Sequence, residues 1–370
     1  MAVTSGTVGL YPYNQRKVID HAFRRAGLRP ENASPEDIQV AQDLIFTLTS
    51  QYVNAGYPLW TRQFQLFGPT IGSAEVPTNP GTVDIIHSYW RILQPWRGPA
   101  TTSGGADASI LFGGQPNADL VIAGPNPGVI APFNGAMEID TIGVLLGGST
   151  PVTAALVLLV SSDGATFIPG QTLPGVTYNP GQWQYFDLDP TLNAPFLQLQ
   201  LPGNAAWTLN QLNFALANGD DILLGELNAD MYYNLPDKLM RNNQPNSAFT
   251  DRQIPAPVLK IWPVPSIRAF YNGCISMLVR RYIQDPGSLT NNIEVPQRWI
   301  EALQWRMANV LIYEIPDRSN AQQSYFTLMA KQQRIAAIGA EAKMAEALMW
   351  AEERTRGPIQ LLPNISGYTR

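Results

Sequence analysis

The sequence of 370 residues contains one cysteine, Cys274, and two histidines, His21 and His87. A single thiol cannot form a disulfide within the chain, and it cannot build a zinc site from several thiolates. Two histidines leave little material for a histidine-rich metal site or a catalytic triad, and we expect both to be structural. Cys274 lies in the apolar run 271–279, so we expect a buried, unreactive thiol rather than a nucleophile.

Long hydrophobic runs and catalytic motifs are also missing. The longest strictly apolar run is 154–160, far short of the roughly 20 residues that span a bilayer. The N-terminus has no charged segment followed by an apolar core, which favours a reducing, cytoplasmic compartment. No Gly-x-x-x-x-Gly-Lys-Ser/Thr, G-x-G-x-x-G, H-E-x-x-H or Gly-x-Ser-x-Gly motif occurs. The sequence therefore predicts a protein that is not an enzyme and that carries no cofactor.

Positive charge is absent from the middle of the chain. Between Gly98 and Asp237 there is no Lys or Arg, while the same stretch holds twelve carboxylates. The flanks carry all 24 basic residues and 17 acidic ones, so the net charge of -5 combines -12 in the middle with +7 in the flanks. Such asymmetry suggests parts with different surroundings. The plainer alternative to a selected electrostatic role is a domain whose solubility comes from uncharged polar side chains.

Helices are expected at both ends. Asn14 can cap a helix over 15–26 that Gly27 ends, and Ser34 with Asp37 forms an acidic capping box for a second helix. Near the C-terminus, Pro296 begins a helix that Pro316 ends.

An Ala-rich helix follows over about 320–354. Its length of about 50 Å exceeds a small domain, so we expect it to pack against other chains or other long helices. An ordinary core helix in an elongated monomer is the alternative.

The middle region predicts β-structure. Short strands with turn residues between them are expected at 138–146, 153–161, 182–188, 195–201 and 209–216. Asp163-Gly164 is a two-residue hairpin signal, and strands at this spacing indicate an antiparallel sandwich. Smaller β elements are expected around this region, among them a strand over 270–283. The predicted fold class is α+β: a helical domain with small β elements and a long C-terminal helix, interrupted by an inserted antiparallel β-sandwich of the jelly-roll type.

Two pairs of carboxylates are weak calcium candidates. Asp187 and Asp189 flank one residue near a strand end, and Asp220 and Asp221 follow a glycine in a turn. Hard carboxylate oxygens are the ligands that calcium prefers, and two carboxylates across a cleft would also suit a glycosidase. Adjacent aspartates in turns are more often turn formers, so the sequence assigns no metal.

Aromatic residues and arginine pairs suggest two more candidate sites, one for sugars and one for DNA. Trp183 and Trp207 lie in the acidic middle, where exposed rings could stack on sugars, although such residues more often fill a sandwich core. Arg280 and Arg281 could face DNA phosphates, as could the pair Arg24-Arg25. Isolated arginine pairs are commonly solvated or bound to carboxylates.

An ordered set of short segments runs along both ends of the chain. The first ones are Ala-Phe-Arg-Arg-Ala-Gly-Leu at 22–28, Ser-Pro-Glu-Asp at 34–37, Tyr-Pro-Leu-Trp at 57–60, Val-Asp-Ile-Ile at 83–86 and Tyr-Trp-Arg at 89–91. Others lie at 233–238, 251–255, 259–265 and 294–296. This set, over roughly residues 1–97 and 222–370, resembles the head-to-tail adaptor (connector) proteins of tailed bacteriophages.

The resemblance implies a structural virion protein of the phage neck, assembled in the host cytoplasm. Residues 1–97 and 222–370 would form one discontinuous helical adaptor domain, with the sandwich inserted as 98–221 and an extended tail at 355–370. The chain would form a homo-oligomeric ring, expected to have twelve subunits, between the portal protein and a tail, nozzle or fibre protein. Double-stranded DNA would pass its lumen without sequence specificity, near Arg280 and Arg281, and no membrane is implied. The tail residues expected to dock on a partner are Gly357, Pro358, Ile359, Leu361, Leu362, Tyr368 and Arg370.

The long middle departs from the adaptor pattern. Ser-Ser-Asp-Gly-Ala-Thr-Phe at 161–167 and Tyr-Phe-Asp-Leu-Asp at 185–189 resemble a galactose-binding-like (discoidin-type) jelly roll. Modules of this type often bind glycans, which implies an alternative function: a carbohydrate-binding or adhesion virion protein that acts through the sandwich. DNA would repel an acidic module, so we expect this module to project away from the channel.

Overall fold

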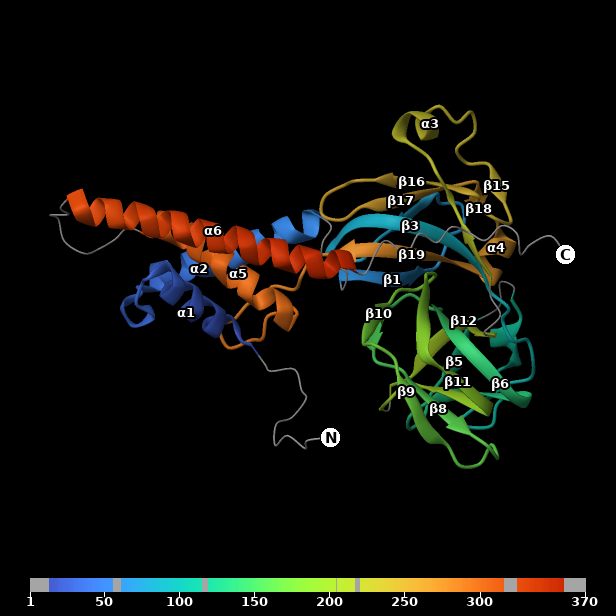
Figure 1. The fold of residues 1–370 in the computed structure, drawn as a ribbon. Coiled ribbons are helices and arrows are strands. Elements are labelled where there is room, and N and C mark those ends of the chain that lie inside the picture. The colour runs from blue at the N-terminus through green and yellow to red at the C-terminus, as the bar shows by residue number, and fades with distance from the viewer. Residues whose placement is uncertain are drawn as a thin grey trace. The chain divides into compact units, whose positions relative to one another are not determined.

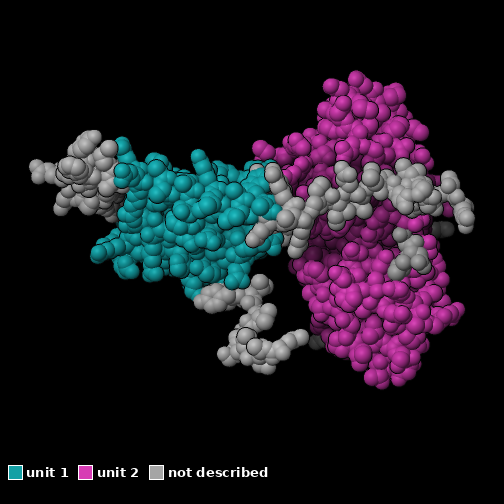
Figure 2. Space-filling model, in the orientation of Figure 1, with its two compact units in different colours: residues 1–61, 282–370 teal, residues 62–281 magenta. Residues whose placement is uncertain are grey.

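The computed structural model describes residues 13–55, 61–114, 119–203, 205–216, 220–315 and 325–355, with the side chains of the last helix given for residues 332–351. The chain forms two compact units, shown in Figure 2. One unit consists of residues 1–61 and 282–370, and the other consists of residues 62–281. The first unit is therefore built from both ends of the sequence, and the second unit is an insertion between them.

The first unit is helical in its described part (Figure 1). Its elements are α1 (Gln15–Ala26), the 3-10 turn η1 (Pro30–Asn32), α2 (Pro35–Asn54), α5 (Gln297–Glu314) and α6 (Tyr325–Thr355).

The predicted caps of α1 and α2 are confirmed. Asn14 Oδ1 accepts a hydrogen bond from Lys17 N at 3.0 Å, and Ser34 and Asp37 each accept from the other's backbone N–H. Gly27 follows α1 with a φ of 78°, in the left-handed region that glycine adopts at little cost.

A single hydrophobic cluster joins α1, α2 and α5. Trp299 of α5 is 1% exposed at this cluster, and its ring meets the edge of Tyr52 of α2 with centroids 5.5 Å apart. The buried residues Ile338, Ala342 and Met349 of α6 recur at helical spacing, so this helix buries one face. Its 31 residues extend about 46 Å.

The second unit contains two four-stranded sheets beside the sandwich. The strand order of the first sheet is β1 (Arg62–Phe67), β19 (Gly273–Arg281), β3 (Thr82–Ile92) and β13 (Asp220–Leu223), and its pairs are all antiparallel. The strand order of the second sheet is β14 (Gly225–Glu226), β16 (Ser247–Asp251), β17 (Val258–Trp262) and β2 (Glu75–Pro77). A shared cluster that includes Trp90, Ile261 and Met277 joins these sheets. The remaining elements here are α3 (Ala229–Tyr233), β15 (Arg241–Asn242) and β18 (Val264–Pro265).

The strand expected over 270–283 is only partly correct. The chain first forms α4 (Ile267–Asn272), because Ser266 Oγ accepts a hydrogen bond from Ala269 N and caps a helix there. Extended backbone begins at Gly273, where β19 starts. A β carbon at Gly273 would lie 2.1 Å from the Trp90 ring, so the close packing of these two strands requires glycine.

The sandwich is one seven-stranded sheet that folds over on itself. The order is β5 (Leu120–Ile122), β12 (Trp207–Leu216), β6 (Gly128–Leu146), β11 (Trp183–Gln200), β8 (Val157–Ser161) and β9 (Ile168–Thr172), and β4 (Thr101–Thr102) also pairs with β6. The turn η3 (Ser109–Phe112) and the small sheet of β7 (Val152–Ala154) and β10 (Val176–Tyr178) complete it.

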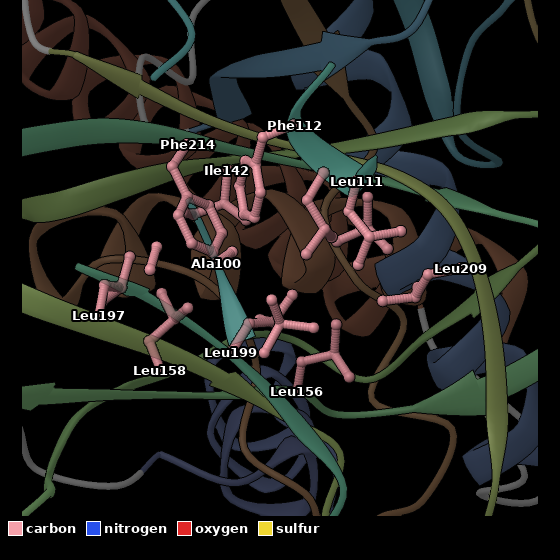
Figure 3. Close-up of a cluster of buried hydrophobic side chains, with 14 of the residues drawn as sticks. Ala100, Leu111, Phe112, Ile142, Leu156, Leu158, Leu197, Leu199, Leu209 and Phe214 are labelled. Atoms are coloured by element: carbon pink, nitrogen blue, oxygen red, sulfur yellow. The ribbon is translucent and has the colours of Figure 1, made fainter. Parts of the chain in front are cut away.

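The two long strands β6 and β11 each contribute to both halves of the folded sheet. The first half of β11 pairs with the second half of β6, and the register shifts between Asp187 and Leu192 and again between Ala194 and Phe196. The second half of β11 pairs with the first half of β6, and it also pairs with β8. The strands expected at 182–188 and 195–201 are therefore two halves of one strand. Side chains from β6, β8, β11 and β12 enclose a common core, shown in Figure 3.

The compact units divide the chain at other places than the expected domain boundaries. The expected boundaries at 97/98 and 221/222 lie within the second unit, which spans residues 62–281. A buried cluster explains the difference, because it joins Leu66 and Leu93 beside the sandwich to Leu145 and Trp183 within it. The four-stranded sheet of β1 and β3 thus packs on the sandwich. Among the described helices, none combines the length and hydropathy needed to cross a lipid bilayer.

Candidate ligand site on the β-sandwich

A hollow of about 330 Å³ opens on the sandwich beside the loop that joins β8 and β9. Its walls come from the end of β8, from this loop, from the start of β9 and from the irregular middle of β11. The lining residues are Val160, Ser161, Ser162, Asp163, Thr166, Ile168, Asn193, Ala194 and Pro195. Hydroxyl, carboxylate and amide groups therefore stand beside aliphatic surface, which includes Ile168 at 59% exposure.

Hydrogen bonds hold the β8–β9 loop in a fixed form. Asp163 Oδ1 accepts from Ser161 Oγ, Ala165 N and Thr166 N, each at 2.9 Å. Ser161 Oγ in turn accepts from Gly164 N at 2.9 Å. Gly164 has a φ of 72°, and a β carbon there would lie 2.9 Å from the Phe196 ring. The expected two-residue hairpin at Asp163-Gly164 is thus a longer loop, because Asp163 binds the backbone N–H groups of the two residues after Gly164 and the Ser161 hydroxyl before it.

The titration of Asp163 tests this loop directly. Hydrogen bonds from Thr166 N, Ala165 N and Ser161 Oγ lower the pKa of Asp163 to about 2. This pKa lies below the roughly 3.9 of an unfolded aspartate, so the bonds stabilise the loop above about pH 4 and their contribution is lost as the pH falls through about 2. We expect ¹³C NMR of the side-chain carboxyl, assigned by its loss in Asp163→Asn, to show a midpoint near pH 2. A midpoint near pH 4 would show that the loop is open in solution.

The opposite wall depends on the irregular part of β11. Because the register shifts between Ala194 and Phe196, Pro195 has no partner in the ladder with β6, whereas Asn193 still pairs with Glu138 and Ala194 with Met137. Asn193 is exposed there, while Ala194 is buried. The sequence reasoning missed Asn193 as a site residue. The only signal was Pro195, which marks a strand irregularity but says nothing about the surface that it faces.

The calcium candidates separate in the structure. Arg91 of β3 donates to Asp221 Oδ1 at 2.8 Å through Nε, to Asp221 Oδ2 at 3.0 Å, and to Asp187 Oδ1 at 3.2 Å. Asp189 and Asp220 are exposed and are not part of this cluster. Within the described segments, no group of three or more His, Cys, Asp or Glu side chains is placed to hold a metal ion. Asp187 and Asp221 thus both accept hydrogen bonds from the Arg91 guanidinium, and calcium binding at these carboxylates stays a prediction.

Electrostatics at this cluster follow from burial and pairing. The hydrogen bond with Asp221 raises the pKa of Arg91. Burial raises the pKa of the neighbouring Asp140. Burial likewise raises the pKa of the Cys274 thiol, whose side chain is fully enclosed, as the sequence predicts for an unreactive cysteine.

The two tryptophans proposed for sugar stacking are buried. Trp183 is 5% exposed and stacks on Tyr185 with ring centroids 5.2 Å apart, and Trp207 is 3% exposed in the sandwich core. Neither ring can receive a sugar on its face. The alternative of core packing is the correct one, because these large rings fill the space between the folded halves of the sheet and beneath the neighbouring sheet.

The arginine pair at 280–281 lies at the end of β19. Arg280 donates to Asp84 Oδ2 at 3.3 Å, and Arg252 reaches the same oxygen at 3.4 Å. These groups border a second hollow of about 370 Å³ in the second unit. Arg280 is thus engaged with a carboxylate, and whether Arg281 meets DNA stays a prediction. The tail residues expected to dock on a partner, Gly357 to Arg370, lie outside the described residues.

Comparisons with known proteins give matches only among solved structures. No protein family and no curated protein matches the sequence. The chain is similar to a carbohydrate-binding module of Clostridium perfringens (CpGH89CBM32-5) in complex with GalNAc-β-1,3-galactose, with 16% identity and a TM-score of 0.27. That likeness covers 32% of this chain and 94% of the module.

Two further structures match a similar share of this chain. The family 32 module of C. perfringens NanJ, in complex with galactose, is 12% identical over 34% of this chain and 98% of that one, with a TM-score of 0.27. A fucolectin from striped bass (Morone saxatilis) serum is 14% identical over 32% of this chain and 47% of that one, with a TM-score of 0.27. The partial neighbours are thus galactose-binding-like β-sandwich domains, and none of these matches is a phage adaptor.

Proposed function

We propose that this chain is a non-enzymatic binding protein whose sandwich holds a short, uncharged carbohydrate in the hollow beside the β8–β9 loop. The observation that carries the proposal is the lining of that hollow: Asp163, Asn193 and the hydroxyls of Ser162 and Thr166 surround aliphatic surface from Ile168. Sugars present the matching groups, since they carry hydroxyls that donate and accept and apolar C–H faces. The volume of about 330 Å³ is at the lower end of the roughly 300–1,000 Å³ of small-molecule sites, which suits one or two sugar rings.

Binding by the full chain on a glycan array, followed by calorimetry with the best ligand, tests this proposal. We expect Asn193→Ala to weaken binding roughly tenfold, because one amide hydrogen bond is lost. Asn179→Ala is the matched control: it also removes an exposed amide, in the turn between β10 and β11, and does not touch the hollow. Absence of any bound glycan, or equal losses in both variants, would count against the site.

A second candidate is the head-to-tail adaptor, with the sandwich as an accessory module. The supporting observation is the helical unit, in which both ends of the sequence meet in one core around Trp299 and α6 extends about 46 Å. In this candidate the chain forms a ring in the phage neck that binds the portal and a tail protein and lets DNA pass. Negative-stain microscopy and mass photometry of the purified chain provide the test. A closed ring of about twelve subunits supports the adaptor, and a monomer at every concentration argues against it.

A further inference from the structure

The second hollow, of about 370 Å³, lies where two sheets of the second unit meet. Its walls come from β3 and β19 of one sheet, from β16 of the other, and from residues 226–227 at the end of β14 (Figure 1). Ile85 and Ala248 line the hollow and also belong to the buried cluster that joins the two sheets. The hollow therefore has a packed floor within one compact unit.

Both sheets leave part of a strand edge open at this hollow. The chain from β13 to β14 covers only the neighbouring parts of these edges, because β13 pairs with residues 89–92 of β3 and β14 pairs with residues 247–248 of β16. Within the described segments, no strand pairs with residues 82–87 of β3 on the β13 side or with residues 249–251 of β16 on the β14 side. Both unpaired stretches line the hollow.

An extended peptide in the hollow would continue the course of the β13–β14 segment. The last main-chain bonds before the hollow run from Leu224 N to Ser88 O at 3.0 Å and from Leu227 N to Ala248 O at 2.8 Å. The chain then leaves the edge, because Asn228 caps α3. Open strand edges bind extended peptides through main-chain hydrogen bonds, so the vacated stretch is suited to an added strand.

Two arginines meet at one end of the hollow. Arg252 and Arg280 both donate to Asp84 Oδ2, at 3.4 Å and 3.3 Å, so two guanidiniums approach one carboxylate oxygen. The Arg252 side chain is 77% exposed. A guanidinium carries five N–H donors in a planar fork that matches a carboxylate, so Arg252 can hold a second carboxylate while it contacts Asp84. This end of the hollow therefore suits a negatively charged group of a ligand.

An acidic residue lies at the opposite end. Glu226 pairs with Ala248 where the open stretch of β16 begins, whereas Arg252 follows the last residue of that strand. Because an extended strand advances roughly 3.3 Å per residue, about 13 Å of chain separates the two positions. β14 runs parallel to β16, so a peptide that continues its direction would bring its C-terminal end to the arginines.

We propose that this hollow binds the C-terminal segment of a partner polypeptide as an added strand, with the terminal carboxylate on Arg252 and Arg280. The open edges of β3 and β16 would supply the main-chain hydrogen bonds. The half-buried Ile86, Leu227 and Phe249 would supply apolar surface for the side chains of the peptide. The site is separate from the hollow beside the β8–β9 loop, so it goes beyond the proposed carbohydrate binding and depends on neither candidate function.

An array of synthetic hexapeptides tests this site on the full chain. The array varies the last four positions, and each peptide is made once with a free C-terminal carboxylate and once with an amide. We expect the best peptides to bind at least roughly tenfold more weakly as amides, because the charged contact with the arginines is lost. Arg252→Gln should cause a loss of similar size. Arg268→Gln, at an exposed arginine of α4 that does not line the hollow, is the matched control and should bind like the wild type.

Main-chain pairing is tested separately with the best peptide. N-methylation of single backbone amides should abolish binding at alternate positions, because an added strand directs every second N–H to the same edge. Hydrogen exchange of residues 82–87 and 249–251 should slow when the peptide is bound.

Four results would overturn the proposal. Equal binding of carboxylate and amide peptides, or equal losses in Arg252→Gln and Arg268→Gln, would remove the arginines from the site. An array without any bound peptide would remove the site itself. Competition by acetate at the concentration of the peptide would reduce the hollow to a site for small anions. Loss of duplex DNA binding in Arg252→Gln, without peptide binding by the wild type, would assign these arginines to nucleic acid.

Discussion

Replacing Trp299 with alanine is expected to lower the free energy of unfolding of the helical unit by roughly 3–5 kcal/mol. The side chain is 1% exposed and packs where α1, α2 and α5 meet, with the edge of the Tyr52 ring against it. Truncation would leave a cavity that neighbouring side chains on three helices cannot fill. Thermal unfolding followed by circular dichroism at the helical band should show an early loss of helix.

The matched control is Tyr313→Ala in the same helix, because Tyr313 is 67% exposed and its loss removes little buried area. Since the chain forms two compact units, the β unit should keep its own later transition in Trp299→Ala. A single transition at the wild-type temperature would show that Trp299 does not support the helical core.

Replacing Arg91 with alanine is expected to destabilise the β unit by roughly 2–3 kcal/mol. Arg91 holds Asp221 with two hydrogen bonds and Asp187 with a third, so it joins β3 to β13 and to the sandwich strand β11. Its loss leaves two carboxylates, and the half-buried Asp140 near them, without their cation. Half of the Asp187 side chain is exposed, which keeps the expected loss below that of a fully buried pair.

Urea unfolding monitored by tryptophan fluorescence measures this loss. Arg252→Ala is the control, because Arg252 is largely exposed and makes one contact of 3.4 Å with Asp84. Arg91→Lys should recover part of the stability, since it restores the charge but not the paired geometry. Equal midpoints for Arg91→Ala and the wild type would show that the two carboxylates tolerate the loss of this arginine.

The Arg91 cluster also bears on the candidate ligand site. Near it, Arg97 donates to the carbonyl of Phe112 at 3.0 Å and to Asn272 Oδ1 at 3.1 Å, and the buried Asn213 donates to the Tyr271 carbonyl. These bonds join the sandwich to α4, the helix that leads into β19, at two points. A carbohydrate in the hollow would therefore be held by a module that is fixed within its unit rather than tethered to it.

Local sequence signals were reliable wherever a few neighbouring residues settle the backbone. The caps at Asn14 and Ser34, the left-handed Gly27 and the start of α5 after Pro296 all follow from groups within one helical turn. The sandwich strands were also visible, although Pro190 and Pro195 made one long strand look like two. The Ser266 cap was overlooked in an apolar run, where a strand was expected.

The candidate site was predicted less well than the fold. The loop residues 161–167 were singled out, but their partner Asn193 and the hollow between them were not. The tryptophans chosen for sugar stacking are core residues. Of the carboxylates chosen for calcium, two accept hydrogen bonds from Arg91 and the other two are exposed to solvent. A sequence shows which residues carry a chemical group, but exposure depends on what packs over that group.

The absence of Lys and Arg from Gly98 to Asp237 was plain from the sequence alone, as were the single buried thiol and the helices at both ends. Only the tertiary structure decided how the arginines just before that stretch contact it: Arg91 donates to the carboxylates of Asp187 and Asp221, and Arg97 donates to the Asn213 amide oxygen. It also decided that the four-stranded sheet belongs with the sandwich, through a core that joins Leu66 to Trp183. The physical reason is that caps and turns are closed by near neighbours, whereas burial and ion pairing arise between residues that folding brings together from distant parts of the chain.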